Sequence, residues 1–226
     1  MKKQNDLSKF LGWIITILIP PILLMISIRL MITPLFPRIE YRLPGFPEDL
    51  YGFTLKDRLN WATPSINYLV NSEEIDDLEK LRFDNGEPIY NERELGHMED
   101  VKRVVTGMRI TLAILLVVLL LLTILVKRYG SRNLVRIAYQ RGGWGIVGVI
   151  AAILIFVVLS FNDLFTWFHQ IFFVGGTWLF NPSDTLIRLF PMRFWQDAFI
   201  FVGLGSMLMG AVIIMISRQV KADRGN

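Results

Sequence analysis

The chain has 226 residues, of which 53% are hydrophobic, and a formal net charge of +4. It is too apolar for an ordinary soluble domain and too short for more than about one or two domains. It has no cysteine, which excludes a disulfide framework, a thiol nucleophile and thiolate metal ligands. Most of the positive charge lies in short segments beside apolar stretches, a pattern typical of membrane topology and not of nucleic-acid binding.

Four apolar stretches approach or exceed the roughly 20 residues that cross a hydrocarbon core of about 30 Å. They are residues 10–32, 106–126, 144–161 and 198–216. A backbone in lipid must satisfy its own hydrogen bonds, so each stretch is predicted to be a helix. The sequence therefore predicts an all-α integral membrane protein with four transmembrane helices, and residues 1–226 are expected to form a single membrane domain.

The basic residues beside these stretches predict the orientation of the chain. Three short segments are basic: the amino terminus with Lys2, Lys3 and Lys9, residues 127–143 with five Lys or Arg and no acid, and the carboxyl terminus after residue 217. Residues 33–105 instead carry nine Lys or Arg and fifteen Asp or Glu, and residues 162–197 carry two and three. Since basic segments stay inside, we expect both termini to be cytoplasmic and both acidic segments to be extracytoplasmic.

Residues 33–105 contain signals for short helices. Three pairs resemble capping boxes, in which two residues three apart cap a helix reciprocally: Thr54 with Asp57, Asn71 with Glu74, and Asn91 with Glu94. They predict a helix to about residue 70, a second short helix that ends near Gly86, and one continuous helix over 92–126. We therefore expect a small helical extracytoplasmic cap.

Residues 162–197 follow directly on Phe161 and are rich in aromatic side chains. Eleven lie between residues 161 and 195: Phe161, Phe165, Trp167, Phe168, Phe172, Phe173, Trp178, Phe180, Phe190, Phe194 and Trp195. An aromatic belt at the membrane interface would explain part of this enrichment. A confined apolar pocket around the one histidine of the segment is the alternative, and it would hold a lipid headgroup at the membrane boundary.

The chain has two histidines, His97 and His169, and both are predicted to lie on the extracytoplasmic side. Histidine is the side chain that titrates unperturbed near neutral pH, so both are candidates for proton transfer. On a helix, Glu94 and Asp100 would share the face of His97. Either carboxylate could accept its Nδ1 proton and support it as a base.

Other functions stay open from the residues alone. The two histidines could bind zinc together with carboxylates among Glu94, Asp100, Asp163 and Asp184, as in a metal-dependent lipid hydrolase. A non-catalytic membrane scaffold protein with an anchoring aromatic segment is a further alternative. Gly143 to Gly148 fits a dinucleotide-binding pattern, but no strand precedes it, so these glycines and Gly210 are expected to permit close helix packing.

Three motifs carry a family resemblance: YGFTLKDRLNWA at residues 51–62, RELGHMEDVK at 93–102, and HQIFFVGGTWLFNPSDTLIRLFP from residue 169 with FWQD after it. In type, order and spacing the chain resembles the lipoprotein intramolecular transacylase (Lit) family over nearly its whole length. The resemblance implies an acyltransferase of the bacterial cell membrane. Its substrates would be diacylglyceryl-modified lipoproteins, whose sn-2 acyl chain moves to the α-amino group of the N-terminal cysteine to give the lyso-form lipoprotein.

The resemblance also implies residue roles. His97 and His169 match the two catalytic histidines of the family, at the extracytoplasmic membrane interface, and which of them acts as the base stays open. We expect Asp100 and Glu94 to support them, and the substrate pocket to include Tyr51, Phe172, Phe173 and Trp178. Besides substrate and membrane lipid, no metal, cofactor, nucleic acid or obligate protein partner is expected.

Overall fold

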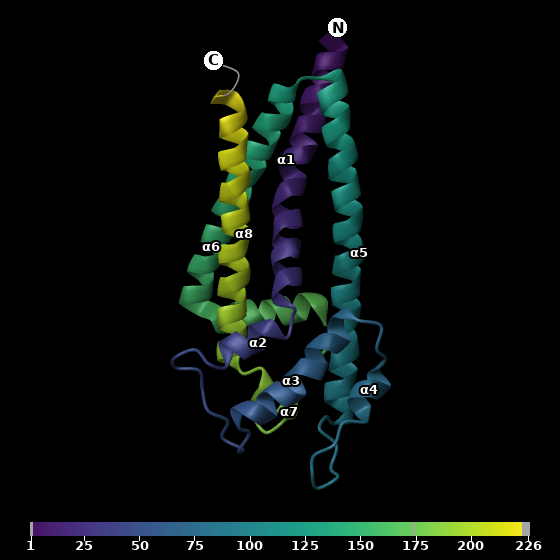
Figure 1. Cartoon of the computed structure of the whole chain (residues 1–226), viewed down its shortest axis with the longest axis vertical. Coiled ribbons are helices and arrows are strands. Elements are labelled where there is room, and N and C mark those ends of the chain that lie inside the picture. The colour runs from purple at the N-terminus through teal and green to yellow at the C-terminus, as the bar shows by residue number, and fades with distance from the viewer. Residues whose placement is uncertain (1, 174, 223–226) are drawn as a thin grey trace. The chain divides into compact units, whose positions relative to one another are not determined.

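The computed structural model describes residues 2–173 and 175–222, which form helices and connecting segments without a β-strand (Figure 1). The helices are α1 (Lys2–Met31), α2 (Leu35–Glu40), α3 (Leu55–Val70), α4 (Ile75–Glu79), α5 (Glu92–Tyr129), α6 (Arg132–Phe172), α7 (Thr185–Leu189) and α8 (Met192–Ala222). Four of them, α1, α5, α6 and α8, are long and apolar enough to cross a membrane. The predicted all-α class with four such helices is confirmed.

Two of these helices are much longer than the apolar stretches inside them. Helix α5 has 38 residues, which at 1.5 Å per residue is roughly 57 Å, about twice the thickness of a hydrocarbon core. Its first turns are highly charged, so only the apolar part near residues 106–126 suits lipid. Helix α6 has a non-helical residue at Ser160 (φ −155°, ψ 64°), and the part before this break is already roughly 42 Å long. His97 and His169 therefore lie outside the lengths that would span a membrane.

The described residues form two compact units. One comprises the chain up to Arg29, Arg109–Ile155 and the part from Ile200 onward, and the other comprises Leu30–Met108 and Phe156–Phe199. We call them the bundle unit and the histidine unit, and each is described by itself. The single membrane domain expected from the sequence stays a prediction.

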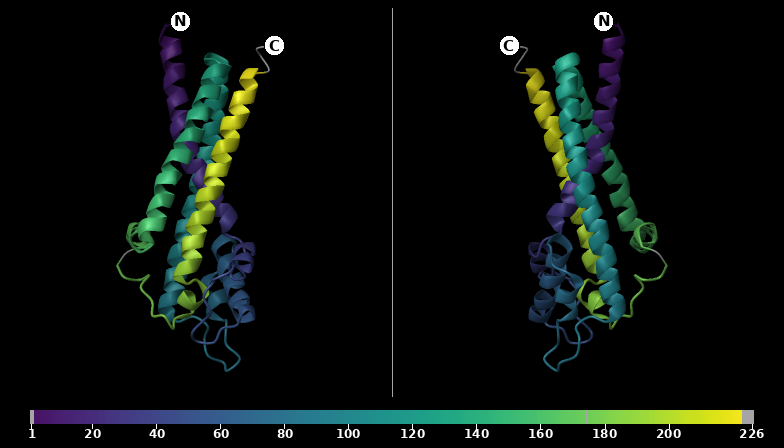
Figure 2. Two further views of the ribbon diagram at one scale, coloured as in Figure 1. Left: turned by 90° about the vertical axis from the view of Figure 1, so that its left-hand side faces the viewer. Right: turned by 90° about the vertical axis from the view of Figure 1, so that its right-hand side faces the viewer.

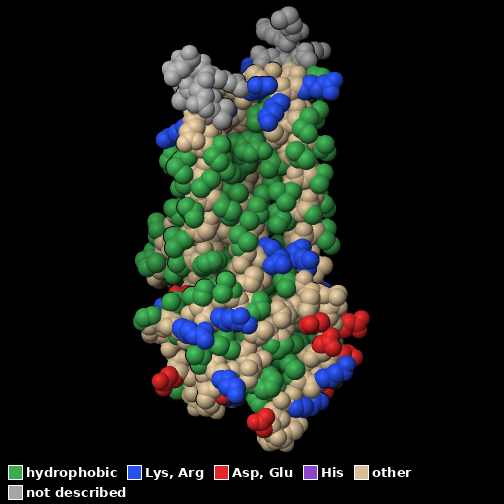
Figure 3. Space-filling model, viewed as in Figure 1, with side chains coloured by type: hydrophobic (Ala, Val, Ile, Leu, Met, Phe, Trp, Pro, Cys, Tyr) green, Lys and Arg blue, Asp and Glu red, His purple; other side chains and the backbone are tan. Residues whose placement is uncertain are grey.

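The bundle unit packs parts of α1, α5, α6 and α8 side by side (Figure 2). Its buried core includes Ile15 and Ile19 of α1, Val126 of α5, and Ile146 and Ile150 of α6. On the face in Figure 3, hydrophobic side chains cover these helices, and Lys and Arg gather at the end of the bundle that carries the termini. An apolar outer surface over an apolar core is what a lipid environment requires, since the lipid tails replace water around the bundle.

Glycines bring two helices of the bundle unit together. A Cβ atom added at Gly210 of α8 would lie 2.6 Å from Ile146, and one at Gly143 of α6 would lie 2.9 Å from the carbonyl oxygen of Gly210. Such small residues let helix backbones approach closely. The expected packing role is thus confirmed for Gly143 and Gly210, whereas a Cβ at Gly148 would meet nothing within 4 Å.

Two helices of the histidine unit begin at the residues that the predicted capping boxes indicated. Thr54 caps α3 reciprocally with Asp57. Asn91 and Glu94 exchange hydrogen bonds of 2.9 and 3.0 Å at the start of α5.

The prediction that Asn71 and Glu74 form a third capping box was wrong. Asn71 ends α3 instead of starting α4, and Glu74 occupies the cap position, with its backbone N–H donating to Asp77 at 3.3 Å. The Asn71 side chain instead accepts a hydrogen bond from the backbone N–H of Glu73.

Hydrogen bonds and an ion pair tie the 181–190 part of the histidine unit to its 33–105 part. The Thr185 hydroxyl donates to the carbonyl of Ile89 at 2.6 Å, and Arg188 pairs with Asp49 at 2.9 Å. Around them a buried cluster gathers residues from both parts: Tyr68, Leu78, Ile89, Tyr90, Met98, Leu186 and Leu189. The two acidic segments predicted from the sequence therefore fold as one body.

Candidate active site

The histidine unit brings the two histidines together. His97 lies in the second turn of α5, and His169 lies in α6 beyond the break at Ser160. Their rings are nearly parallel, at 20°, with centroids 6.2 Å apart. Both are buried, with 9% and 7% of their surface exposed. Two residues that are 72 positions apart thus share one site, and its centre is largely dry.

Aromatic side chains enclose both imidazoles. Five have ring centroids within 6 Å of one or both of them: Phe165, Phe168, Phe173, Trp178 and Phe180. Phe173 contacts both, at 4.8 Å from His97 and 5.4 Å from His169. We call these five side chains the aromatic box. An arrangement of this kind excludes water and strengthens electrostatic interactions inside it.

The structure brings two of the four predicted pocket residues to the imidazoles. Phe173 and Trp178 belong to the aromatic box. Phe172 is 48% exposed, and its described ring contact is with Phe168. Tyr51 is 52% exposed and lies beside Arg188, which donates to its carbonyl oxygen at 3.2 Å.

Sequence reasoning counted Phe165, Phe168 and Phe180 among the eleven aromatic side chains but did not name them as substrate-pocket residues. Phe165 precedes His169 by four residues on the same helix, so a helical reading of residues 161–172 would have found it. Phe180 lies 5.4 Å from His97, and no local pattern connects these two residues.

The tautomer of His169 follows from one hydrogen bond. Its Nδ1 atom lies 2.8 Å from the carbonyl oxygen of Phe165. A carbonyl only accepts, so Nδ1 carries the hydrogen and donates it, which leaves the lone pair of the neutral ring on Nε2. His169 therefore presents a proton acceptor at Nε2.

The expected carboxylate partner of His97 is missing among the described residues. Its Nδ1 atom is buried and has no hydrogen-bond partner there. The two oxygens of Glu94 accept from the backbone N–H groups of Asn91 and Leu186, at 2.9 and 2.7 Å. The prediction that Glu94 would hold His97 was wrong, because the start of α5 and of α7 both need this carboxylate as an acceptor.

Asp100 likewise makes no hydrogen bond to His97 in the described part of the chain. It pairs instead with Arg103 at 3.0 Å. Its charge still acts on the ring at longer range, as the pKa of His97 shows.

The surroundings favour neutral imidazoles. Burial lowers the pKa of His97 from 6.5 to about 4, with a further lowering by His169 and a partial compensation by the charge of Asp100. Burial also lowers the pKa of His169, against the opposing hydrogen bond to Phe165. At neutral pH both rings are therefore uncharged and able to accept a proton.

One further polar atom at the site lacks a partner. The indole Nε1 of Trp178 is buried without a hydrogen-bond acceptor among the described residues, and its ring centroid lies 4.8 Å from that of His169. An unsatisfied buried donor of this kind costs free energy, and a bound acceptor would remove that cost.

The carboxylates considered as zinc ligands together with the two histidines have other partners. Asp163 hydrogen-bonds to Ser160, and Asp184 pairs with Arg93 at 3.4 Å. Within the described ranges no three His, Asp or Glu side chains gather closely enough to hold a metal ion.

The site residues fall in a region shared with a known family. The model of the lipoprotein intramolecular transacylase Lit family matches residues 13–195, which include both histidines and the whole aromatic box. This chain belongs to the Lit family. A Lit-family assignment agrees with the resemblance seen in the sequence motifs.

Two further likenesses extend over the full chain. An uncharacterized protein of Aquifex aeolicus (strain VF5) is 29% identical over 211 residues, covering 92% of this chain and 93% of that protein. The in meso structure of the membrane integral lipoprotein intramolecular transacylase Lit from Bacillus cereus has a TM-score of 0.78 at 16% identity, covering 98% of this chain and 99% of the other. That similarity establishes the fold, and with the four apolar helices it makes this Lit-family chain a multi-pass membrane protein.

Nitrogen-15 NMR of protein labelled at histidine tests the geometry of the site, because only two imidazoles contribute signals. We expect His169 to show the tautomer protonated at Nδ1, and His97 to stay neutral as the pH falls through 6.5. A His169→Gln variant assigns the signals. A His169 ring protonated at Nε2 at pH 7 would contradict the hydrogen bond to Phe165.

Proposed function

We propose that this chain moves the sn-2 acyl chain of an S-diacylglyceryl lipoprotein to the α-amino group of its N-terminal cysteine. The observation that carries the proposal is the stacking of the two histidines of the chain inside the aromatic box. Membership of the Lit family supports the reaction class. The product is an N-acyl, S-monoacylglyceryl lipoprotein.

The reaction needs two proton transfers. An α-amino group has a pKa of about 7.7–8.0, so the substrate arrives mostly as an ammonium ion. It must lose one proton to become a nucleophile and a second as the amide forms. The C–N bond forms as the ester C–O bond breaks, and the glyceryl oxygen leaves with a proton as an alcohol. One proton is therefore released, and one is passed from nitrogen to oxygen.

Two neutral imidazoles can carry out both transfers. In the proposed sequence His97 accepts the first proton from the ammonium group. As the amine attacks and the C–O bond breaks, protonated His97 gives its proton to the glyceryl oxygen while the Nε2 atom of His169 takes the proton that nitrogen loses, so only one imidazole is protonated at a time. His169 finally releases its proton to solvent. No acyl-enzyme is formed.

The electrostatics of the site support this order. The substrate brings one positive charge, and the sequence keeps a single positive charge in the box until the last release. Two imidazolium rings with centroids 6.2 Å apart in a dry site would repel strongly. Burial lowers the pKa of His97, so its protonated form donates readily to a poor leaving group, and the same dry surroundings lower the pKa of the substrate ammonium that gives it the first proton.

Trp178 is the proposed donor to the developing oxyanion. Attack on the ester carbonyl places negative charge on its oxygen, and a positioned donor in a dry site stabilises that charge. The indole N–H of Trp178 is buried beside His169, and the described part of the chain offers it no acceptor. A substrate ester carbonyl would supply the missing acceptor.

Confinement supplies the other part of the proposed catalysis. The amine and the ester belong to one flexible molecule, and well-oriented intramolecular reactions reach effective molarities of about 10⁵–10⁸ M. The aromatic box would fold the headgroup while the acyl chains stay in lipid. Exclusion of water would also suppress hydrolysis of the same ester, which is why transfer is favoured over the lipid hydrolase alternative.

The proposed location follows from the charge pattern. Both termini and residues 127–143 would be cytoplasmic, and the histidine site would face the extracytoplasmic interface. Diacylglyceryl lipoproteins would reach it by lateral diffusion in the membrane. No cofactor takes part in this scheme, because the ester itself supplies the acyl group.

Substitution of either histidine tests the mechanism. We expect His97→Ala and His169→Ala each to lower conversion by about 10²–10⁴-fold, the contribution typical of acid–base groups. Tandem mass spectrometry of the lipoprotein N-terminal peptide gives the readout, because transfer leaves the total mass unchanged and only fragments locate the acyl chain. Glu99→Ala and Gln170→Ala, at exposed neighbouring positions, are matched controls. A peptide that loses the mass of one acyl chain would instead identify a hydrolase, and normal conversion in either histidine variant would rule out the paired mechanism.

Trp178→Phe tests the oxyanion donor, because it keeps a ring in the box and removes the N–H group. We expect turnover to fall by about 10²–10³-fold with little change in KM. Trp167→Phe is the matched control, since Trp167 is exposed and stacks on Phe156 at 5.4 Å. Equal activity of the two variants would leave Trp178 a packing role only.

Cysteine labelling tests the orientation on a background without native cysteine. We expect Ser183→Cys to react with an impermeant thiol reagent in intact cells and Arg132→Cys to react only after the membrane is opened. Both positions are exposed in the structure. Labelling of Arg132→Cys from outside would reverse the proposed topology.

A further inference from the structure

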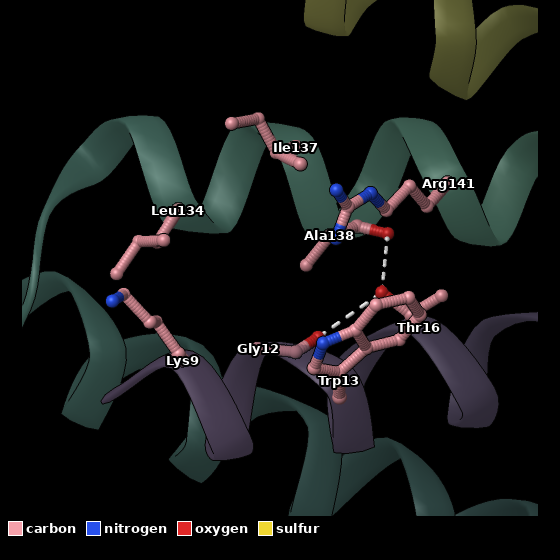
Figure 4. Close-up of a pocket in the computed structure, with 8 residues that line it drawn as sticks. All are labelled: Lys9, Gly12, Trp13, Thr16, Leu134, Ile137, Ala138 and Arg141. Carbon is pink, nitrogen blue, oxygen red and sulfur yellow. Dashed lines mark hydrogen bonds between the residues drawn. The ribbon is translucent and has the colours of Figure 1, made fainter. Parts of the chain in front are cut away.

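The bundle unit contains a groove between α1 and α6, far in the sequence from either histidine. It has a volume of about 250 Å³ and is lined by Lys9, Gly12, Trp13 and Thr16 of α1 and by Leu134, Ile137, Ala138 and Arg141 of α6. Figure 4 shows Lys9 and Arg141 projecting from opposite helices beside it. The two cations are the only charged residues in this lining.

Close packing of the two helices gives the groove a floor. The Thr16 hydroxyl lies 3.1 Å from the carbonyl oxygen of Gly12 and 3.2 Å from that of Ala138, so it bridges α1 and α6 (Figure 4). One turn further on, a Cβ atom at Gly142 would lie 2.7 Å from Ile19, which shows how near the helices come there.

The charge in the groove is held in place and incompletely neutralised. The Arg141 guanidinium lies 4.7 Å from the ring centroid of Trp13, a cation–π contact that orients it without cancelling its charge. Among the described residues Lys9 forms an ion pair with Asp6, at 3.8 Å, and both side chains are more than half exposed. A pair that long and exposed is weak. Two positive charges therefore face the groove.

We propose that this groove binds the headgroup of an anionic phospholipid, with the phosphodiester between Lys9 and Arg141. Basic pockets between membrane helices recognise such headgroups by charge. None of the residues that line the groove belongs to the aromatic box, and the proposal does not depend on the proposed acyl transfer.

The surface beside the groove suits the rest of a lipid. Phe10, Trp13 and Ile17 of α1 and Trp144 and Val149 of α6 are each more than half exposed. Acyl chains would lie against Ile17 and Val149, and tryptophans such as Trp13 and Trp144 favour the headgroup level of a membrane. An apolar continuation of this kind distinguishes a lipid site from a site for free phosphate.

Native mass spectrometry of the full-length protein in detergent tests the proposal, with phosphatidylglycerol, phosphatidylcholine or inorganic phosphate added. We expect the wild-type protein to retain phosphatidylglycerol in preference to phosphatidylcholine. Each groove charge should contribute roughly fivefold in affinity, so the double variant K9Q R141Q should bind phosphatidylglycerol roughly 25-fold more weakly and lose the preference. Both side chains are exposed, so the variant should unfold at the same temperature as the wild type.

Two matched variants separate a specific site from general charge. K127Q R128Q removes two exposed charges that do not line the groove and should keep the preference. K9R R141K keeps both groove charges and should keep it as well. Retention of phosphatidylglycerol by K9Q R141Q, or equal loss in K127Q R128Q, would overturn the proposal. Displacement of the lipid by inorganic phosphate at equal concentration would assign the groove to free phosphate and overturn it as well.

Discussion

The buried carboxylate of Glu94 is the interaction on which the histidine unit depends. Its side chain is 1% exposed and accepts backbone hydrogen bonds from Asn91 at the start of α5 and from Leu186 in α7. A buried charge is tolerated only when it is satisfied in this way. The same carboxylate therefore begins the helix that carries His97, one turn further on, and fixes the segment that follows Phe180 against it. Glu94 therefore contributes to the site by positioning His97.

Charge is the second constraint on the site. The aromatic box has no acidic side chain hydrogen-bonded to either imidazole among the described residues, and burial disfavours a charge on each ring. Such a site is able to receive the one positive charge of a substrate ammonium and resists a second. A carboxylate beside His97 would have held that ring protonated and removed its capacity to accept a proton. The absence of the expected Glu94 contact is thus consistent with the chemistry proposed for the site.

The sequence predicts those features that are local. Helix starts at Thr54 and Asn91 are visible because both capping partners lie within three residues, and the apolar stretches are visible from their length. The break at Ser160 was not predictable from glycine or proline, since neither lies beside it. Glu94 accepts a hydrogen bond from Leu186, which lies 92 residues away in the sequence. His97 contacts Phe180, which is also far from it in the sequence. Contacts of this type are set by how the segments pack, and no spacing rule reveals them.

The two histidines were recognised because the chain has no others, yet their number alone does not define a site. The two histidines form one site because three segments meet within a single compact unit. These segments are a turn of α5, the part of α6 beyond Ser160, and the residues around Phe180. In the proposed mechanism His169 acts as a base, and the hydrogen bond of its Nδ1 atom to the carbonyl of Phe165 would keep its ring from turning to follow a mobile substrate. The substrate would then have to be brought to Nε2, and in the proposed mechanism the aromatic box does this. An intramolecular transfer needs little more than such walls and two proton carriers, since donor and acceptor already belong to one molecule.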